Sequence, residues 1–299
     1  MTTLMKKALM GATVVAGMSA IASAPASAFT MTGNDYLLYD VTGNSTYVNQ
    51  SANLNNILAG NSANPGGNVE LFASSETLTN AQYLASNART SVSGLVGGSM
   101  LTLSSLTAAD WFSTGSGMSM NYGANNLATT WFNAFLNAAG QGSASNLAKT
   151  LAYNTFFGIG GFQRSSDPNI SYINTSGSDI NIGLAGHFDL KAFYTRPGSA
   201  FAPLAALLPN GFQASEVVRA TYNGTTQYLY SFSATQTGLT NSVGAGADNL
   251  SHSGNYQVSL RGVVTPPPPT AVPEPSAMLA LFGLGGFLIS KKRQQSKTA

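Results

Sequence analysis

The chain has 299 residues, of which 8% are charged, 43% are hydrophobic and none is cysteine. The lack of cysteine excludes disulfide bonds, thiolate zinc sites and a cysteine nucleophile. The formal net charge of +2 comes from the two ends of the chain, which hold six of the 13 Lys and Arg residues but only one of the 11 Asp and Glu residues. The remaining body therefore has a net charge of −3, which gives no support for a nucleic-acid partner.

Residues 1–28 have the pattern of a secretory signal peptide: two lysines near the start, then a run of apolar and small residues. The small residues Ala26 and Ala28 place the signal-peptidase cut between Ala28 and Phe29, with a cut after Ala24 as the alternative. Without cleavage, the same run would remain as a membrane anchor. The cleavage pattern favours export of the body.

The body, residues 29–265, opens with a strand pattern. Residues 36–48 have β-forming side chains on both sides of the Gly43-Asn44 pair, which predicts a hairpin with a two-residue turn. Residues 49–68 are rich in Asn, Gly and Ser and indicate a loop. Apolar residues at helical spacing then predict a helix; they are Ala81, Leu84, Ala85, Ala88 and Val92.

Two stronger helices are predicted in the middle of the body. The first has large apolar residues at positions i, i+4 and i+8, namely Leu127, Trp131 and Phe135. The second has Leu147 and Leu151 on its apolar face, behind a serine cap at position 143 or 145. The link at residues 139–142 is short, so we expect the two helices to be antiparallel neighbours.

After these helices the hydrophobic period changes to two. Residues 180–184 and residues 187–192 each alternate between apolar and polar side chains, which predicts two half-buried strands. The Asn223-Gly224 pair lies between two β-forming runs and predicts a second hairpin. Residues 255–264 predict a last strand. The body is therefore expected to have an α+β fold, a mostly antiparallel sheet with a central helical region.

The only histidines of the chain are His187 and His252, so only these two positions could supply an imidazole to a catalytic or binding site. On a strand, His187 and Asp189 share a face, and such a pair can act as a general base and its orienting partner. The simpler interpretation is the polar side of a half-exposed strand. Neither a Gly-x-Ser-x-Gly nucleophile motif nor a metal-binding motif accompanies the pair, so we expect no metal and no cofactor.

A stretch rich in glycine, residues 156–172, follows the second predicted helix and continues into Arg164 and Asp167. A phosphate-binding loop has the glycines between a strand and a helix and is followed by lysine, so this order argues against one. We interpret Gly158 as a helix stop and Asp167-Pro168 as a turn, held by an ion pair between Arg164 and Asp167.

Trp111 and Trp131 are candidates for sugar contact because aromatic faces can stack on pyranose rings. The alternative is packing in the core, which the helical spacing of Trp131 favours. Both interpretations stay open at the level of the sequence.

The C-terminal region begins with a proline-rich linker, residues 266–271, for which we expect an extended polyproline II conformation. Within the tail, residues 272–299, the apolar segment 276–290 would form a helix of ~22 Å, a marginal span for a hydrocarbon core of ~30 Å. Cations favour the cytoplasmic side, which places the body outside the cytoplasm. Three cations directly follow the apolar segment: Lys291, Lys292 and Arg293.

The tail resembles the PEP-CTERM sorting tail of exported bacterial proteins. The resemblance rests on Val272, Pro273, Glu274 and Pro275, followed by a glycine-bearing hydrophobic stretch and the basic cluster. It implies processing by an exosortase, a membrane-embedded protease or transpeptidase, in bacteria that make exopolysaccharide. The cluster departs from many such tails because it is rich in lysine. The body phrase "SDPNISY" is similar to uncharacterised exported proteins with this tail, and it implies no activity.

Together these patterns predict an exported protein of the cell surface or extracellular matrix, transiently anchored in the inner membrane. Its expected partners are signal peptidase, exosortase, the membrane through its C-terminal helix, and exopolysaccharide in a biofilm. We expect no catalytic activity. Two alternatives are a carbohydrate-binding module that uses the two tryptophans and, as a weaker one, a secreted hydrolase that uses His187 and Asp189.

Overall fold

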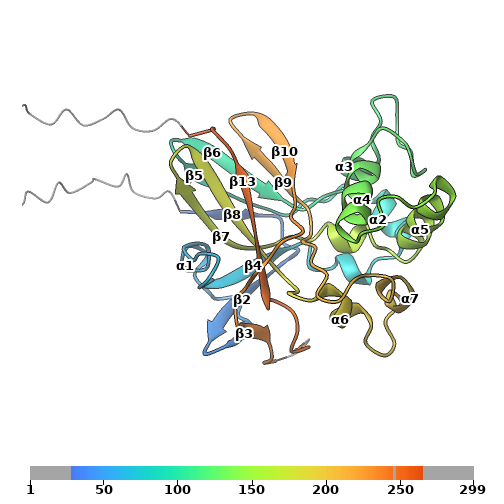
Figure 1. Ribbon diagram of the computed structural model, residues 1–299. Helices are drawn as coiled ribbons and strands as arrows, with labels where there is room; N and C mark the ends of the chain where they lie inside the picture. The colour runs from blue at the N-terminus through green and yellow to red at the C-terminus, as the bar shows by residue number, and fades with distance from the viewer. Residues whose placement is uncertain (1–27, 245–246, 265–299) are drawn as a thin grey trace, which may run out of the picture.

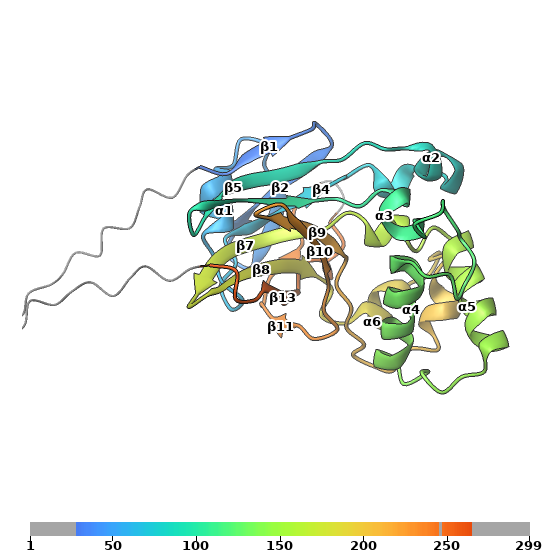
Figure 2. The same ribbon diagram turned by 90° about the horizontal axis from the view of Figure 1, so that it is seen from above.

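Two sheets pack face to face in the computed structural model, which describes residues 28–244 and 247–264. A lobe of helices lies at one end of this sandwich (Figure 1). The same division is visible from above, where the strands occupy one side and the larger helices the other (Figure 2). The predicted α+β class therefore holds in its coarse form, with two sheets in place of one.

The smaller sheet is antiparallel throughout. Its strands, in spatial order, are β1 (Thr30–Thr32), β5 (Ser91–Val96), β6 (Ser99–Ser104), β9 (Val218–Tyr222) and β10 (Thr225–Leu229).

The larger sheet is antiparallel except for the pairing of β12 with β3 at one edge. Its strands, in spatial order, are β11 (Thr235–Gln236), β13 (Gly254–Leu260), β8 (Asp179–Gly186), β7 (Asn169–Ser176), β4 (Gly67–Leu71), β2 (Tyr36–Thr42), β3 (Ser45–Val48) and β12 (Thr240–Asn241).

Both predicted hairpins are confirmed. The Gly43-Asn44 pair joins β2 to β3, and the Asn223-Gly224 pair joins β9 to β10. The second turn has positive φ at both positions, 49° at Asn223 and 78° at Gly224, which is the conformation of a type I′ turn. The twist of such a turn matches the twist of the strands, so each pair sets its register locally.

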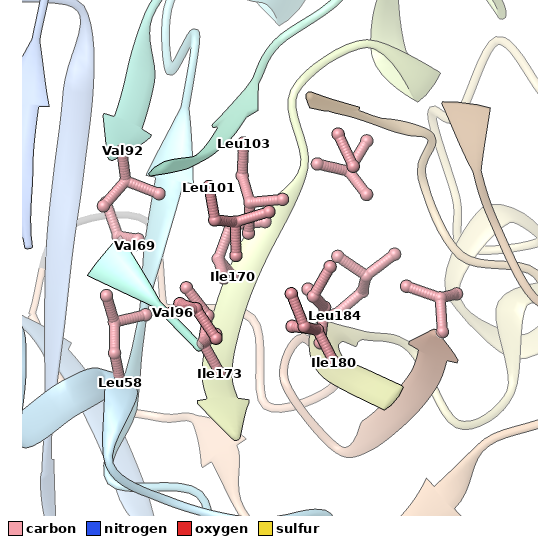
Figure 3. Close-up of a cluster of buried hydrophobic side chains, with 14 of the residues drawn as sticks. Leu58, Val69, Val92, Val96, Leu101, Leu103, Ile170, Ile173, Ile180 and Leu184 are labelled. Atoms are coloured by element: carbon pink, nitrogen blue, oxygen red, sulfur yellow. The ribbon is translucent and has the colours of Figure 1, made fainter. Parts of the chain in front are cut away.

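The sandwich core is formed by the inward side chains of both sheets (Figure 3). On β8, Ile180, Ile182 and Leu184 are fully buried, as their alternation predicts. They meet residues of the opposite sheet, including Leu101 and Leu103 of β6. Burial of each such side chain contributes about 1.5–3 kcal/mol, so this core is the main source of stability for the sandwich.

The lobe has a second core that is mostly aromatic. Phe162 lies at its centre, with ring centroids 5.2 Å from Trp111, 5.1 Å from Tyr153 and 5.0 Å from Phe156. The main helices of the lobe are α2 (Asn80–Ala85), α3 (Ala108–Phe112), α4 (Leu127–Ala138), α5 (Asn146–Gly158), α6 (Leu190–Tyr194) and α7 (Ala202–Ala205).

The predicted helices of the middle region are confirmed as α4 and α5, and α5 ends at Gly158. Asn126 caps α4 by accepting from the Thr129 N–H at 3.0 Å, and Ser145 caps α5 by accepting from the Ala148 N–H at 3.3 Å. The two helices are neighbours, because the Phe132 and Tyr153 rings meet with centroids 5.2 Å apart.

Several local predictions were wrong. The predicted loop 49–68 contains helix α1 (Leu54–Leu58) and the start of β4. The helix predicted over residues 81–92 ends at Ala85, and Val92 belongs to β5. Leu147 and Leu151 lie on the outer face of α5, exposed by 81% and 68%.

The predicted ion pair between Arg164 and Asp167 is absent within the described residues. Arg164 instead lies 3.8 Å from Glu76, and the Asp167 carboxylate accepts from the Ser75 hydroxyl. Both contacts connect 3₁₀-helix η2 (Gln163–Ser165) and the turn after it to η1 (Ser75–Thr77). The turn is therefore held by a different chain segment from the one that the sequence suggested.

No helix within residues 28–244 and 247–264 is long and apolar enough to span a membrane. The predicted apolar segment 276–290 lies outside the described residues, as do most of the signal peptide and the linker 266–271.

Candidate ligand pocket

A cavity of about 310 Å³ opens between the helices of the lobe and the end of the sandwich. Its walls are mostly apolar and come from four helices that are far apart in the sequence. Representative wall residues are Phe135 and Leu136 of α4, Ala152 and Phe156 of α5, Tyr194 of α6 and Ala205 of α7. A volume of this size and a lining of this kind are typical of a small-molecule site.

Lys149 lines the pocket and lies in the first turns of α5. It is half-buried, and its Nζ donates to the Gly142 carbonyl oxygen at 2.6 Å. Among the described residues, no carboxylate forms an ion pair with this ammonium group. The pocket lining therefore contains a cation whose charge is not neutralised by any carboxylate of the described residues.

Arg164, which follows α5 in the sequence, also lines the pocket, and its charge is already engaged. Its guanidinium lies 3.8 Å from the Glu76 carboxylate and donates to the Ile159 carbonyl oxygen at 3.2 Å. It also lies over the Phe201 ring, 5.3 Å from the centroid. These contacts fix the side chain as part of the wall.

Glu216 supplies a carboxyl group to the inner wall. One of its oxygens accepts from the Asn169 backbone N–H at 3.0 Å. Burial, with a further contribution from the charge of Glu70, raises the pKa of Glu216 well above its usual range. Burial and the charge of Glu216 also raise the pKa of Asp167. The inner wall therefore favours a protonated, neutral carboxyl group.

The structure does not bring His187 and Asp189 together as a catalytic pair. Residues 187–192 were predicted as a strand, but β8 ends at Gly186 and Asp189 caps helix α6 by accepting from the Ala192 N–H at 2.9 Å. The His187 ring stacks on Phe193 with centroids 3.7 Å apart. Burial lowers the pKa of His187 to about 4, so the imidazole is neutral at pH 7.

Trp111 and Trp131 were candidates for sugar stacking or for packing in the core, and the structure places both of them in the core. Their side chains are 0% and 2% exposed, and the two rings meet edge to face at 5.6 Å. Trp111 Nε1 donates to Ser166 Oγ at 2.7 Å. Neither indole presents an open face to solvent, because both belong to the aromatic core of the lobe.

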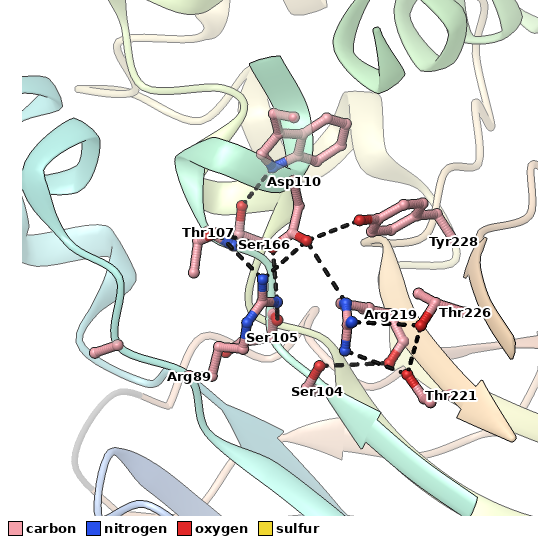
Figure 4. Close-up of polar contacts among 12 residues, drawn as sticks. Arg89, Ser104, Ser105, Thr107, Asp110, Ser166, Arg219, Thr221, Thr226 and Tyr228 are labelled. Carbon is pink, nitrogen blue, oxygen red and sulfur yellow. Dashed lines mark hydrogen bonds and ion pairs between the residues drawn. The ribbon is translucent and has the colours of Figure 1, made fainter. Parts of the chain in front are cut away.

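A cluster of polar side chains joins the lobe to the smaller sheet, and the sequence analysis did not predict this joint (Figure 4). Asp110 of α3 lies 2.7 Å from Arg89 and 3.6 Å from Arg219 of β9, and it accepts from the Tyr228 hydroxyl at 2.8 Å. Burial opposes ionisation of Asp110, but bonds from Arg89, the Thr107 backbone and Tyr228 outweigh it and lower the pKa. The arginines lie far from Asp110 in the sequence, so no local pattern marks the joint.

The sorting residues predicted from the tail, Val272–Pro275 and Lys291–Arg293, lie outside the described residues. Residues 271–294 match the PEP-CTERM protein-sorting motif. The chain carries a PEP-CTERM tail. This motif implies an exported protein that is transiently anchored in the membrane and then processed by an exosortase. No curated protein and no solved structure matches the chain.

Proposed function

We propose that the body of this PEP-CTERM protein is a non-catalytic component of the cell surface or extracellular matrix, where it associates with exopolysaccharide. The lobe is the part that faces away from the membrane before exosortase processing. One observation carries the orientation: both ends of the described body lie at the end of the sandwich opposite the helices (Figure 1).

Contacts with β5 and with the turn that follows it support this arrangement. A Cβ atom at Gly94 of β5 would lie 2.5 Å from the Phe29 ring, and a Cβ atom at Gly97, just after β5, would lie 2.6 Å from Val264. The first and last packed residues of the body therefore rest on neighbouring positions of the same sheet. The tail continues from that end, so a membrane anchor there leaves the lobe as the far end of the molecule.

The surface chemistry and the histidines support a matrix role without catalysis. Lys149 and Lys191 are the only lysines of the body, and its other polar side chains are mostly Asn, Ser, Thr and Gln, which can hydrogen-bond to sugars. His252 is buried against Thr46, and His187 is stacked on Phe193. Both packings favour a structural role for the imidazoles.

Labelling of intact cells tests the display of the lobe at the cell surface. A membrane-impermeant amine reagent should modify Lys149 and Lys191 of the lobe, with the sites assigned by mass spectrometry of the mature protein. Lys191→Arg is the control for site assignment and should lose one label only. If these lysines were labelled only after cell lysis, the proposed display of the lobe would be refuted.

Co-sedimentation tests the association with exopolysaccharide. The mature protein should sediment with exopolysaccharide from the producing cells and remain in solution with unrelated dextran. Equal recovery in the presence and absence of the polymer would remove exopolysaccharide from the proposal and leave the orientation intact.

A further inference from the structure

The lining of the pocket includes residues from more than two turns of helix α5. These residues are Ala148, Lys149, Ala152 and Phe156, from one side of that helix. A helix rises 1.5 Å per residue, so the lined part of α5 is about 12 Å long. The two alanines keep this side of the helix shallow, which leaves room for an extended ligand between α5 and α7.

The apolar lining of the pocket reaches the protein surface. Leu207 lines the pocket and is 68% exposed. Lys149, on α5, supplies the charge that the protein leaves unpaired among its described residues.

We propose that this pocket binds a single-chain anionic amphiphile, with the hydrocarbon chain between α5 and α7 and the anionic head at Lys149. The wall residues Phe156 and Ala205 contact the hydrocarbon chain, and the exposed Leu207 contacts it where the pocket opens to solvent. This site is independent of the exopolysaccharide association proposed above.

The charges of the pocket favour an anion over a cation. Arg164 is paired with Glu76, so these two groups largely neutralise one another. Glu216 lies in a setting that favours its protonated form, which leaves Lys149 as the main source of net charge. The apolar tail of this chain is a poor candidate for the occupant, because the described body ends on the opposite side of the sandwich (Figure 2).

Calorimetric titration of the mature protein with decanoate, below its micelle concentration, tests the site. Ala152→Trp fills the slot and should weaken binding by more than about tenfold. Leu151→Trp is the matched control, because its side chain points to solvent on the same helix, and it should bind within about twofold of wild type. Thermal melting confirms folding, and Ala148→Trp at the more exposed end replaces Ala152→Trp if that variant unfolds.

The head group is tested with decyltrimethylammonium, a cation with the same chain length. Wild type should prefer decanoate, and Lys149→Gln should weaken decanoate by about fivefold without weakening the cation. If decanoate did not bind, if its affinity were unchanged in a folded slot-filling variant, or if the cation bound as tightly as decanoate, the proposal would be overturned.

Discussion

The Arg89 guanidinium lies 2.7 Å from the Asp110 carboxylate, and this contact joins the segment before β5 to helix α3 of the lobe. Arg219 of β9 approaches the same carboxylate from the smaller sheet, at 3.6 Å. Asp110 also accepts from the Thr107 N–H at 2.7 Å, as part of the capping box of α3. One buried carboxylate therefore caps a helix and offsets two cations where the two halves of the molecule meet.

Asp110→Asn should destabilise the protein by about 3–5 kcal/mol, because it leaves Arg89 and Arg219 without their shared counter-charge in a half-buried site. The measurement is the free energy of unfolding from urea titration. Glu76→Gln is the matched control, since the Glu76 side chain is 59% exposed and forms a surface ion pair with Arg164. The control should change stability by less than about 1 kcal/mol. Equal effects of the two variants would contradict the role of the joint.

The two tryptophans of the lobe core should respond differently to replacement by phenylalanine. Trp111 Nε1 donates to Ser166, whereas Trp131 Nε1 is buried and has no hydrogen-bond partner among the described residues. Trp111→Phe removes one hydrogen bond to Ser166 Oγ, which keeps its bonds with Tyr83 and Phe162, and should cost about 0.5–1.5 kcal/mol more than the cavity alone. Trp131→Phe removes an unsatisfied donor, so its net cost should be smaller. Thermal melting of both variants compares them, and a larger loss for Trp131→Phe would contradict the assignment.

Local chemistry explains which elements the sequence could predict. The hairpin at Asn223-Gly224 depends on two residues that accept positive φ, and the cap of α5 depends on Ser145, so a short window is sufficient. The alternation of residues 187–192 fits a strand equally well. The outcome there was decided by Asp189 as a helix cap and by stacking of His187 on Phe193.

The pocket could not be predicted from the sequence, because its lining residues are far apart along the chain. Phe135, Ala152, Tyr194 and Ala205 come from four helices, and only the tertiary packing of the lobe brings them together. The spacing of Leu147 and Leu151 indicates an apolar face of α5, but burial on that helix follows a different side. The sorting tail was predictable because its three parts are contiguous in the sequence.

Glu70 should make the protein less stable as the pH rises. Burial is the main cause that raises its pKa from 4.5 to about 7, although the Tyr39 hydroxyl, which donates to it at 3.0 Å, acts in the opposite direction. The folded state therefore holds the proton more tightly than the unfolded state, and stability falls between about pH 4.5 and 7. Glu70→Gln removes this titration. The free energy of unfolding of the variant, measured relative to that of wild type, should be up to about 3 kcal/mol higher at pH 8 than at pH 4.

Urea unfolding of wild type and Glu70→Gln at the two pH values measures this gain. Glu70→Gln also removes a charge that raises the pKa values of Glu216 and Asp167, so the difference measures Glu70 together with this coupling. A difference between variant and wild type that did not change with pH would show that Glu70 titrates alike in the folded and unfolded states.

His252 should produce the opposite dependence at acid pH. Its ring is buried between Thr46, whose hydroxyl lies 2.7 Å from Nδ1, and the edge of Tyr39, with ring centroids 4.6 Å apart. Burial lowers its pKa from 6.5 to about 3, with a smaller contribution from His187. The unfolded state therefore takes up the proton first. Stability from the neutral imidazole is complete above about pH 6.5 and is lost as the pH falls toward 3.

His252→Asn tests this dependence, because asparagine tolerates the positive φ of 68° at this position and does not titrate. The variant loses ring packing and should be less stable than wild type at pH 7. Between pH 7 and 4, however, its free energy of unfolding should fall by up to about 3 kcal/mol less than that of wild type. Urea titrations at intervals of half a pH unit measure both slopes. Parallel slopes would mean that the His252 ring is already protonated, or already exposed, in the folded protein.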